Sequence, residues 1–154
     1  MDDLHSQQLF TLTLKVKFTE MIDIGVLPHG RRRIAPVESG HFEGARLKGS
    51  VLPGGADWVL NRADGGMKVD VRIALRTDDG AAIYMQYWGH FRAAPDIARR
   101  FNRGEQLAPT DYYLRTVAAF ETAAPNYAWL NEIITVGSGA QAPGGVIYTL
   151  HEIL

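Results

Sequence analysis

Residues 67–91 read Met67-Lys-Val-Asp-Val-Arg-Ile-Ala-Leu-Arg-Thr77-Asp-Asp-Gly80-Ala-Ala-Ile-Tyr-Met-Gln-Tyr-Trp-Gly-His-Phe91, and this stretch decides the fold. Apolar and polar residues alternate on both sides of the Asp-Asp-Gly segment. Alternation with a period of two is typical of a half-buried strand, and a short loop that ends in glycine is typical of a hairpin turn. The stretch therefore predicts a β-hairpin.

The length of the loop decides which side chains share a face of this hairpin, because a shift of one residue exchanges the two faces. A two-residue Asp79-Gly80 turn places apolar residues beside charged ones. A three-residue loop with Gly80 in the left-handed conformation gathers the apolar residues, so the hydrophobic pattern favours it. The apolar face of this register consists of Val69, Val71, Ile73, Leu75, Ile83, Met85 and Tyr87. The opposite face carries Asp70, Arg72, Ala74, Arg76, Ala82, Tyr84, Gln86, Trp88 and His90. Such a mixed face fits an outer wall, an interface or the lining of a pocket, and the sequence leaves the three open.

The composition is that of an ordinary globular protein of about one domain. The chain has 154 residues, of which 46% are hydrophobic and 21% are charged, and its formal net charge is −1. We expect a single β-barrel domain over residues 9–154, preceded by an N-terminal tail over residues 1–8. The near-zero charge argues against a nucleic-acid partner, since Arg31-Arg32-Arg33 is the only basic run.

Several classes of function are disfavoured by what the sequence lacks. Cysteine is absent, which excludes disulfides and thiol chemistry. No apolar run approaches the roughly 20 residues that span a bilayer, and the polar start of the chain does not resemble a signal peptide. We therefore expect a cytoplasmic protein without membrane contact. No phosphate-binding loop, dinucleotide fingerprint or Gly-x-Ser-x-Gly motif occurs, and the five histidines lack the spacing of metal ligands. The sequence thus predicts neither a metal site nor a cofactor.

The rest of the chain reads as further strands and one short helix. The helix is expected from Ala94 to Gly104, because Pro95 fits a first turn and Gly104 fits an end. Glycines within residues 40–52 indicate bends that help a sheet to close. Strands are expected at residues 10–18, 33–37, 40–52, 57–60, 111–122, 127–136 and 146–154, with a loop at 137–145. This pattern predicts an all-β fold, an antiparallel β-barrel of about eight or nine strands with one short helix.

Several short segments carry a resemblance to a known family. They include Gly40-His41-Phe42-Glu43-Gly44, Gly54-Gly55-Ala56-Asp57-Trp58, Thr77-Asp78-Asp79-Gly80, Tyr113-Leu114-Arg115-Thr116 and Tyr127-Ala128-Trp129-Leu130-Asn131. With these segments, which run in order from near residue 9 to the end, the chain resembles the bacterial and fungal family called domain of unknown function 3237. The resemblance implies a compact β-barrel, and it supplies no agreed reaction.

The candidate site residues are polar side chains within β-rich, aromatic segments. Asp57 follows a glycine turn and has no local partner, so it is the candidate general base or acid, since an apolar environment raises the pKa of a carboxyl. Arg72 and Arg115 are candidates for holding an anion, and Tyr84 for donating a hydrogen bond. The predicted catalytic residues are therefore Asp57, Arg72 and Tyr84. The predicted ligand-binding residues are Asp70, Tyr113, Arg115, Glu121, Trp129 and Asn131.

Three functions fit these residues. The first is a small-molecule-binding barrel that acts as a cofactor-free isomerase, cyclase or lyase by proton transfer on a carbonyl compound. It requires Asp57, Arg72 and Arg115 to converge on one cavity. The second is a non-catalytic small-molecule binding protein that uses the same cavity. The third is a self-associating structural module whose Tyr- and Trp-rich face forms a homodimer or higher homo-oligomer.

Overall fold

The hairpin predicted at residues 67–91 is formed by β6 (Met67–Thr77) and β7 (Ala82–Ala93) in the computed structural model, which describes residues 3–154. Leu75 lies opposite Ile83, as the three-residue loop requires. Gly80 has a φ of +95°, and the Thr77 N–H donates a 2.9 Å hydrogen bond to the Ala81 carbonyl oxygen across the loop. Every residue of the predicted apolar face is buried. The predicted register is confirmed.

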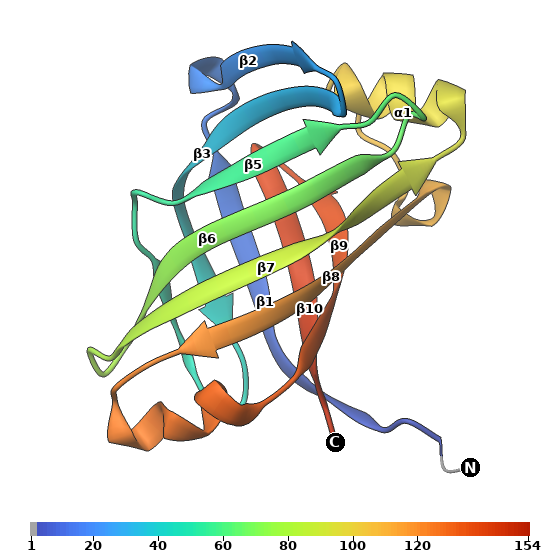
Figure 1. Cartoon of the computed structure of the whole chain (residues 1–154). Helices are drawn as coiled ribbons and strands as arrows, with labels where there is room; N and C mark the ends of the chain where they lie inside the picture. Colours follow the sequence, from blue (N-terminus) through green and yellow to red (C-terminus); the bar gives the residue numbers. More distant parts are fainter. Residues whose placement is uncertain (1–2) are drawn as a thin grey trace.

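The other strands extend this hairpin into a closed barrel (Figure 1). They are β1 (Ser6–Val16), β2 (Ile22–Leu27), β3 (Gly30–Glu43), β4 (Lys48–Val51), β5 (Ala56–Asn61), β8 (Tyr112–Glu121), β9 (Thr135–Ala142) and β10 (Gly145–Ile153). The sheet runs from β1 through β10, β9, β8 and β7 to β6; β4 and β5 each bridge β6 and β3, and β3 pairs back with β1. The result is a closed antiparallel barrel of eight strands with two extra strands. The predicted all-β barrel is confirmed.

Helical segments are short and lie at the two ends of the barrel (Figure 1). The one α-helix among residues 3–154, α1 (Pro95–Asn102), falls within the predicted range. The 3-10 segments are η1 (Phe18–Glu20), η2 (Pro109–Asp111) and η3 (Pro125–Glu132). None of these helices, within residues 3–154, has the length and apolar character needed to cross a membrane.

Two predicted segments were wrong. Residues 127–136 were expected to be a strand, yet η3 occupies most of this range and buries Leu130. Residues 137–145 were expected to be a loop, yet β9 occupies most of them. Its small residues are needed there, because a side chain at Gly139 would collide with Leu114 and Tyr148. In addition, β1 begins at Ser6, inside the segment expected to be a tail.

The interior differs between the two ends of the barrel. Towards η3 it is filled by aromatic and aliphatic side chains, with the Phe10 ring centre 5.3 Å from that of Phe42 and 5.9 Å from that of Phe120. Glycines allow the strands to approach closely, since a side chain at Gly49 would collide with the Arg76 carbonyl group. Towards α1 the interior is not filled, and a cavity opens there.

Candidate functional site

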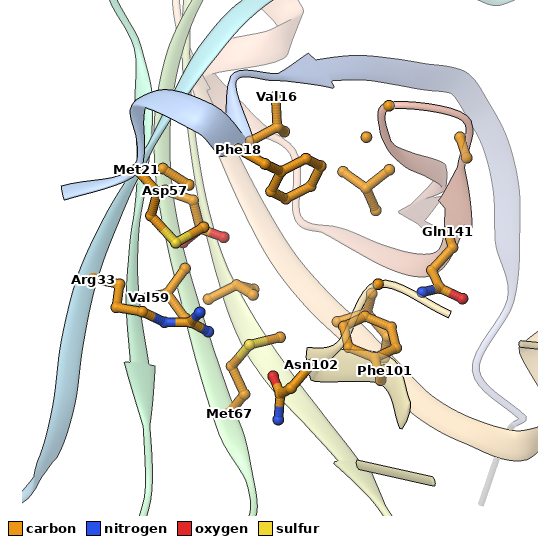
Figure 2. A pocket seen from close by; sticks show the side chains of 18 of the residues that line it. Val16, Phe18, Met21, Arg33, Asp57, Val59, Met67, Phe101, Asn102 and Gln141 are labelled. Atoms are coloured by element: carbon orange, nitrogen blue, oxygen red, sulfur yellow. The ribbon is translucent and has the colours of Figure 1, made fainter. Parts of the chain in front are cut away.

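The cavity has a volume of about 560 Å³. Its lining comes from the inner faces of the strands, from η1, from the end of α1 and from the turn between β9 and β10 (Figure 2). Most of the lining side chains are apolar, among them Val16, Met21, Val59, Val69, Leu114 and Val146. Phe18 contributes to the lining and is nevertheless 56% exposed, so it lies at the mouth. A cavity of this size and character accommodates a small, partly apolar molecule.

Asp57 contributes a carboxyl group to this cavity (Figure 2). Because side chains alternate along a strand, Asp57 and Val59 share the inner face of β5, while Trp58 between them lies on the outer face. The Oδ1 atom of Asp57 accepts a 3.0 Å hydrogen bond from the backbone N–H of Asp70. The local structure thus fixes the carboxyl group at the wall of a mostly apolar space.

Burial raises the pKa of Asp57 to about 7, because little water reaches the carboxylate to stabilise its charge. The hydrogen bond from Asp70 and the positive charges of Arg33 and Arg32 act in the opposite direction, and the negative charge of Asp70 adds to the rise. Within residues 3–154, Asp57 takes part in no salt bridge. A carboxyl group that titrates near neutral pH is able both to take up and to release a proton.

Two buried tyrosines adjoin Asp57. The rings of Tyr87 on β7 and Tyr148 on β10 meet edge to face with their centres 5.0 Å apart, and Tyr148 lines the cavity. Burial raises the pKa of both hydroxyls, and the negative charge of Asp57 raises the two pKa values further. Both phenols therefore remain protonated at neutral pH.

Arg33 of β3 brings a positive charge to the same cavity. Its Nε donates a 2.9 Å hydrogen bond to Oδ1 of Asn61 on β5. Burial lowers the pKa of Arg33, and the nearby charge of Arg31 lowers it further. A guanidinium nevertheless stays charged at neutral pH. The second arginine of the lining, Arg103, forms a salt bridge of 2.9 Å with Glu105. The cavity thus combines the titrating acid Asp57 with two arginines, of which Arg33 has no salt-bridge partner within residues 3–154.

The hairpin places two of the predicted catalytic residues outside the cavity. Arg72 lies on the outer face of β6, where its NH1 is 3.8 Å from Oδ1 of Asp70 and its guanidinium carbon is 5.4 Å from the centre of a Trp58 ring. Tyr84 lies on the outer face of β7 and is 37% exposed. The predicted convergence of Arg72 with Asp57 on one cavity is therefore wrong. The register that buries the apolar face turns the other face outward.

The predicted binding residues of β8 also lie on the outer wall. Tyr113, Arg115 and Glu121 alternate with buried residues and are exposed. Arg115 donates a 2.9 Å hydrogen bond to the carbonyl oxygen of Leu114, and its guanidinium carbon lies 5.0 Å from the ring centre of Tyr113. The predicted convergence of Arg115 with Asp57 is wrong for the same reason as that of Arg72.

Trp129 and Asn131 lie on η3 instead of a strand. Asn131 accepts a hydrogen bond from the Thr122 N–H and donates one to the Thr122 carbonyl oxygen, both of 2.9 Å. The Trp129 ring packs against Arg46, whose guanidinium carbon is 3.8 Å from the ring centre. Asn131 thus holds η3 against the end of β8, and Trp129 holds it against the connection from β3 to β4. Neither residue is part of the cavity lining.

Sequence analysis missed Arg33, Tyr148 and the rim of the cavity. Arg33 was interpreted as part of a basic run. It lies, however, on the same face of β3 as Ala35 and Val37, and the burial of these two residues turns Arg33 towards the interior. That alternation was visible in the sequence. The rim was not predictable in this way, because Phe18 and Phe101 come from distant segments that are brought together only when the barrel closes.

The cavity gathers polar groups whose chemistry suits proton transfer and anion binding. Within residues 3–154, no group of three or more His, Cys, Asp or Glu side chains is placed to hold a metal ion. The titrating carboxyl of Asp57, the cation of Arg33 and the phenol of Tyr148 are instead arranged around the same space. These groups are those required to move a proton and to stabilise an oxyanion.

Comparison with known proteins places this barrel among close structural relatives. A UPF0311 protein of Rhodopseudomonas palustris is 34% identical over 98% of this chain and 97% of its own length. A crystal structure of a conserved protein of unknown function from the same organism matches with a TM-score of 0.93 at 32% identity, covering 100% of both chains. A crystal structure of a protein with unknown function from Clostridium acetobutylicum matches with a TM-score of 0.88 at 33% identity, covering 99% of this chain and 100% of that one.

A more distant match comes from a fungus. A crystal structure described as that of an enzyme from Penicillium herquei has a TM-score of 0.75 at 18% identity and covers 100% of this chain and 97% of that chain. At this level of identity the likeness shows a common fold and nothing more.

The family model described as protein of unknown function DUF3237 matches residues 6–153. This range begins where β1 begins and ends where β10 ends. The match confirms the resemblance found in the sequence, and it agrees with the relatives that align over almost the whole chain. The chain belongs to the DUF3237 family.

Proposed function

We propose that this barrel binds a small, partly apolar carbonyl compound and moves a proton on it, with Asp57 as the acid–base group. The observation that carries the proposal is the position of the Asp57 carboxyl: it faces the cavity, it has no cationic partner within salt-bridge distance among residues 3–154, and its pKa is raised to about 7. A buried acid of this kind reduces the stability of a fold, so its presence in a cavity favours a functional role.

The step that follows from this chemistry is an enolisation. The Asp57 carboxylate takes a proton from the carbon next to a carbonyl group and becomes a neutral carboxyl. The electron pair of the broken C–H bond forms a carbon–carbon double bond, and the electrons of the carbonyl double bond move to its oxygen. The carboxyl then returns a proton to the enolate. If its proton has first been replaced by one from the solvent and is returned to the same carbon, the outcome is hydrogen exchange. If the proton goes to another atom, the outcome is isomerisation, or a first step of cyclisation or elimination.

The fold relationship supports this proposal indirectly. The structure from Penicillium herquei is described as that of an enzyme, so a barrel of this shape is compatible with catalysis. The identity of 18% carries no reaction from that protein to this chain.

A second candidate is a non-catalytic small-molecule binding protein. It is favoured by the scarcity of titratable groups, because Asp57 is the one acid among the described lining residues and no histidine accompanies it. A reaction that needs separate acid and base residues would require a second group.

Deuterium exchange tests the proposal without knowledge of the natural substrate. The probe is 2-tetralone in D₂O, whose acidic methylene signals are followed by NMR with and without the protein. We expect exchange above the buffer rate for the native chain and a loss on the order of a hundredfold for Asp57→Asn. The matched control is Asp78→Asn in the β6–β7 loop, which should exchange at the native rate. Binding of the probe without accelerated exchange supports the binding protein instead.

A further inference from the structure

Arg33 has an unusual position for an arginine. It lies in the strand face that also carries the buried residues Ala35 and Val37, and Figure 2 shows its guanidinium pointing into the cavity beside Val59. The 2.9 Å hydrogen bond from its Nε to Asn61 fixes the plane of the group. The two terminal nitrogens are then presented to the cavity in a fixed orientation.

Arg33 forms no salt bridge within residues 3–154. The carboxylate of Asp23 is paired with Arg31, so the charges of Asp23 and Asp57 act on Arg33 only from beyond salt-bridge distance. The Asp57 carboxyl is half protonated at about pH 7 and so provides only part of a counter-charge at neutral pH. A partly desolvated cation without a partner is stabilised by an anion placed beside it.

We infer that the cavity takes an apolar anion, a molecule with an aromatic or aliphatic body and a single oxyanion that Arg33 holds. The oxyanion is a carboxylate, or an enolate or phenolate of the same delocalised type. This inference deepens the proposed function and rests on it for the choice of cavity. The two proposals require different things of the ligand. The anion site requires a negative charge on the ligand, whereas the proposed function requires the transfer of a proton.

A charged probe and its neutral counterpart separate the role of Arg33 from general hydrophobic binding. Isothermal titration calorimetry compares 2-naphthoate with 2-naphthamide, which have nearly the same shape. We expect the native chain to bind 2-naphthoate at least about tenfold more tightly. Arg33→Met should remove this preference while 2-naphthamide binds as before, and Arg33→Lys should keep part of it. The control is Arg31→Met, two residues away on the same strand, which should leave the preference intact.

The outcomes are distinguishable from those of the exchange experiment. Equal affinities of the native chain for the two probes, or an undiminished preference in Arg33→Met, would overturn the inference. A preference that depends on Arg33 together with no exchange of 2-tetralone would leave the anion site standing and remove the proton transfer. Exchange of 2-tetralone without any preference for 2-naphthoate would support the proton transfer and remove the anion site.

A separate observation concerns the outer wall of β7, β8 and β9. Trp88 lies opposite Val117, and Val117 lies opposite Val136, so the three form one row across the strands. Their exposed fractions are 45%, 38% and 40%. Ile134, just before β9, is 64% exposed, and Tyr84 extends the same face at 37%. A contiguous apolar surface of this kind is typical of an interaction site.

The charges on β8 indicate which partner fits this surface. Arg115 and Glu121 lie on the outer face at opposite sides of Val117 and Ala119, and neither forms a salt bridge within residues 3–154. A twofold axis across β8 at Ala118 would place Arg115 of one chain opposite Glu121 of the second copy, and the reverse. An isologous interface repeats each contact in this way.

We propose that a second copy of this chain covers the row of Trp88, Val117 and Val136. Sedimentation equilibrium from 1 to 100 µM tests it. Arg115→Glu and Glu121→Arg should each weaken the dimer, and the combination of both should restore it, because the ion pairs then form with exchanged signs. Arg76→Glu, on the outer face of β6, is the control and should leave the dimer unchanged. A native chain that stays monomeric at 100 µM, or a double variant as weak as the single ones, would overturn the proposal.

Discussion

The backbone N–H of Asp70 donates a 3.0 Å hydrogen bond to Oδ1 of Asp57, at a place where the ladder between β5 and β6 is interrupted. The opposing carbonyl oxygen of Trp58 accepts a 2.8 Å hydrogen bond from the Arg32 guanidinium. Side chains thus satisfy two backbone groups at this gap, the N–H of Asp70 and the carbonyl oxygen of Trp58. The consequence is a carboxyl group held by the backbone of the neighbouring strand, in a position from which it faces the cavity.

Asp70 affects this carboxyl group in two ways that a single substitution separates. Its N–H lowers the pKa of Asp57 and its side-chain charge raises the pKa. Asp70→Asn keeps the N–H and removes the charge, so the pKa of Asp57 should fall. Carboxyl ¹³C chemical shifts followed through a pH titration measure the change. Asp78→Asn, at the far end of the hairpin, is the control and should leave the titration unchanged; an increase in Asp70→Asn would contradict the electrostatic account.

The hairpin was predictable in detail because two independent signals agreed. The Asp-Asp-Gly segment limited the loop to two lengths, and the apolar residues of both strands fit only one of them. The same reasoning could have excluded Arg72 from the cavity. Once Val71 and Ile73 are assigned to the interior, Arg72 between them must face outward.

Local sequence patterns do not predict the cavity itself. A period-two pattern shows which residues share a face, yet it does not show that the interior is left unfilled near Asp57 and packed near Phe10. That difference depends on the side chains that eight strands bring together. β9 was missed for a related reason: its small residues resemble a loop, and they are required because neighbouring strands come close at Gly137 and Gly139.

Gly80 provides a test of the hairpin turn. Its φ is +95°, and a Cβ at this position would meet no atom within 4 Å, so a substitution there acts through the backbone alone. Gly80→Val should lower the free energy of unfolding by roughly 1–2 kcal/mol or more. Gly80→Asn should cost less, because asparagine tolerates positive φ better. Urea denaturation of the three proteins measures the order, and a neutral Gly80→Val would contradict the three-residue loop.

Thr116 offers a stabilising substitution. Its Oγ1 is buried and has no hydrogen-bond partner among the described residues. Thr116→Val exchanges this hydroxyl for a methyl group of similar shape and should raise the free energy of unfolding by about 1 kcal/mol. Thr135 is the matched control: its buried Oγ1 donates a 2.8 Å hydrogen bond to the Ala118 carbonyl oxygen. Thr135→Val should therefore destabilise the protein, and a loss of stability in both variants would show that the Thr116 hydroxyl is satisfied.

The raised pKa of Asp57 also predicts how stability depends on pH. The folded-state pKa is about 7, whereas the ordinary value is 3.8, so between these limits the folded chain holds a proton that the unfolded chain has released. The free energy of unfolding must then fall as the pH rises through this window, by up to about 1.4 kcal/mol per pH unit from this group. Below pH 3.8 the contribution is complete, and above about pH 7 it is lost.

Asp57→Asn removes this titration and keeps a side chain of the same shape. Its stability relative to the native chain should therefore increase as the pH rises, with a gain on the order of a few kcal/mol between pH 4 and pH 8. Urea denaturation of both proteins across this range measures the difference, which cancels the other titrating groups. Asp64→Asn is a control for which the stability relative to the native chain should fall as the pH rises. The reason is that the hydrogen bond from the Gly66 N–H lowers the pKa of Asp64. A difference between Asp57→Asn and the native chain that is constant with pH would mean that the carboxyl is ionised in the folded state at pH 5, as on an ordinary surface, and the basis for its acid–base role would be lost.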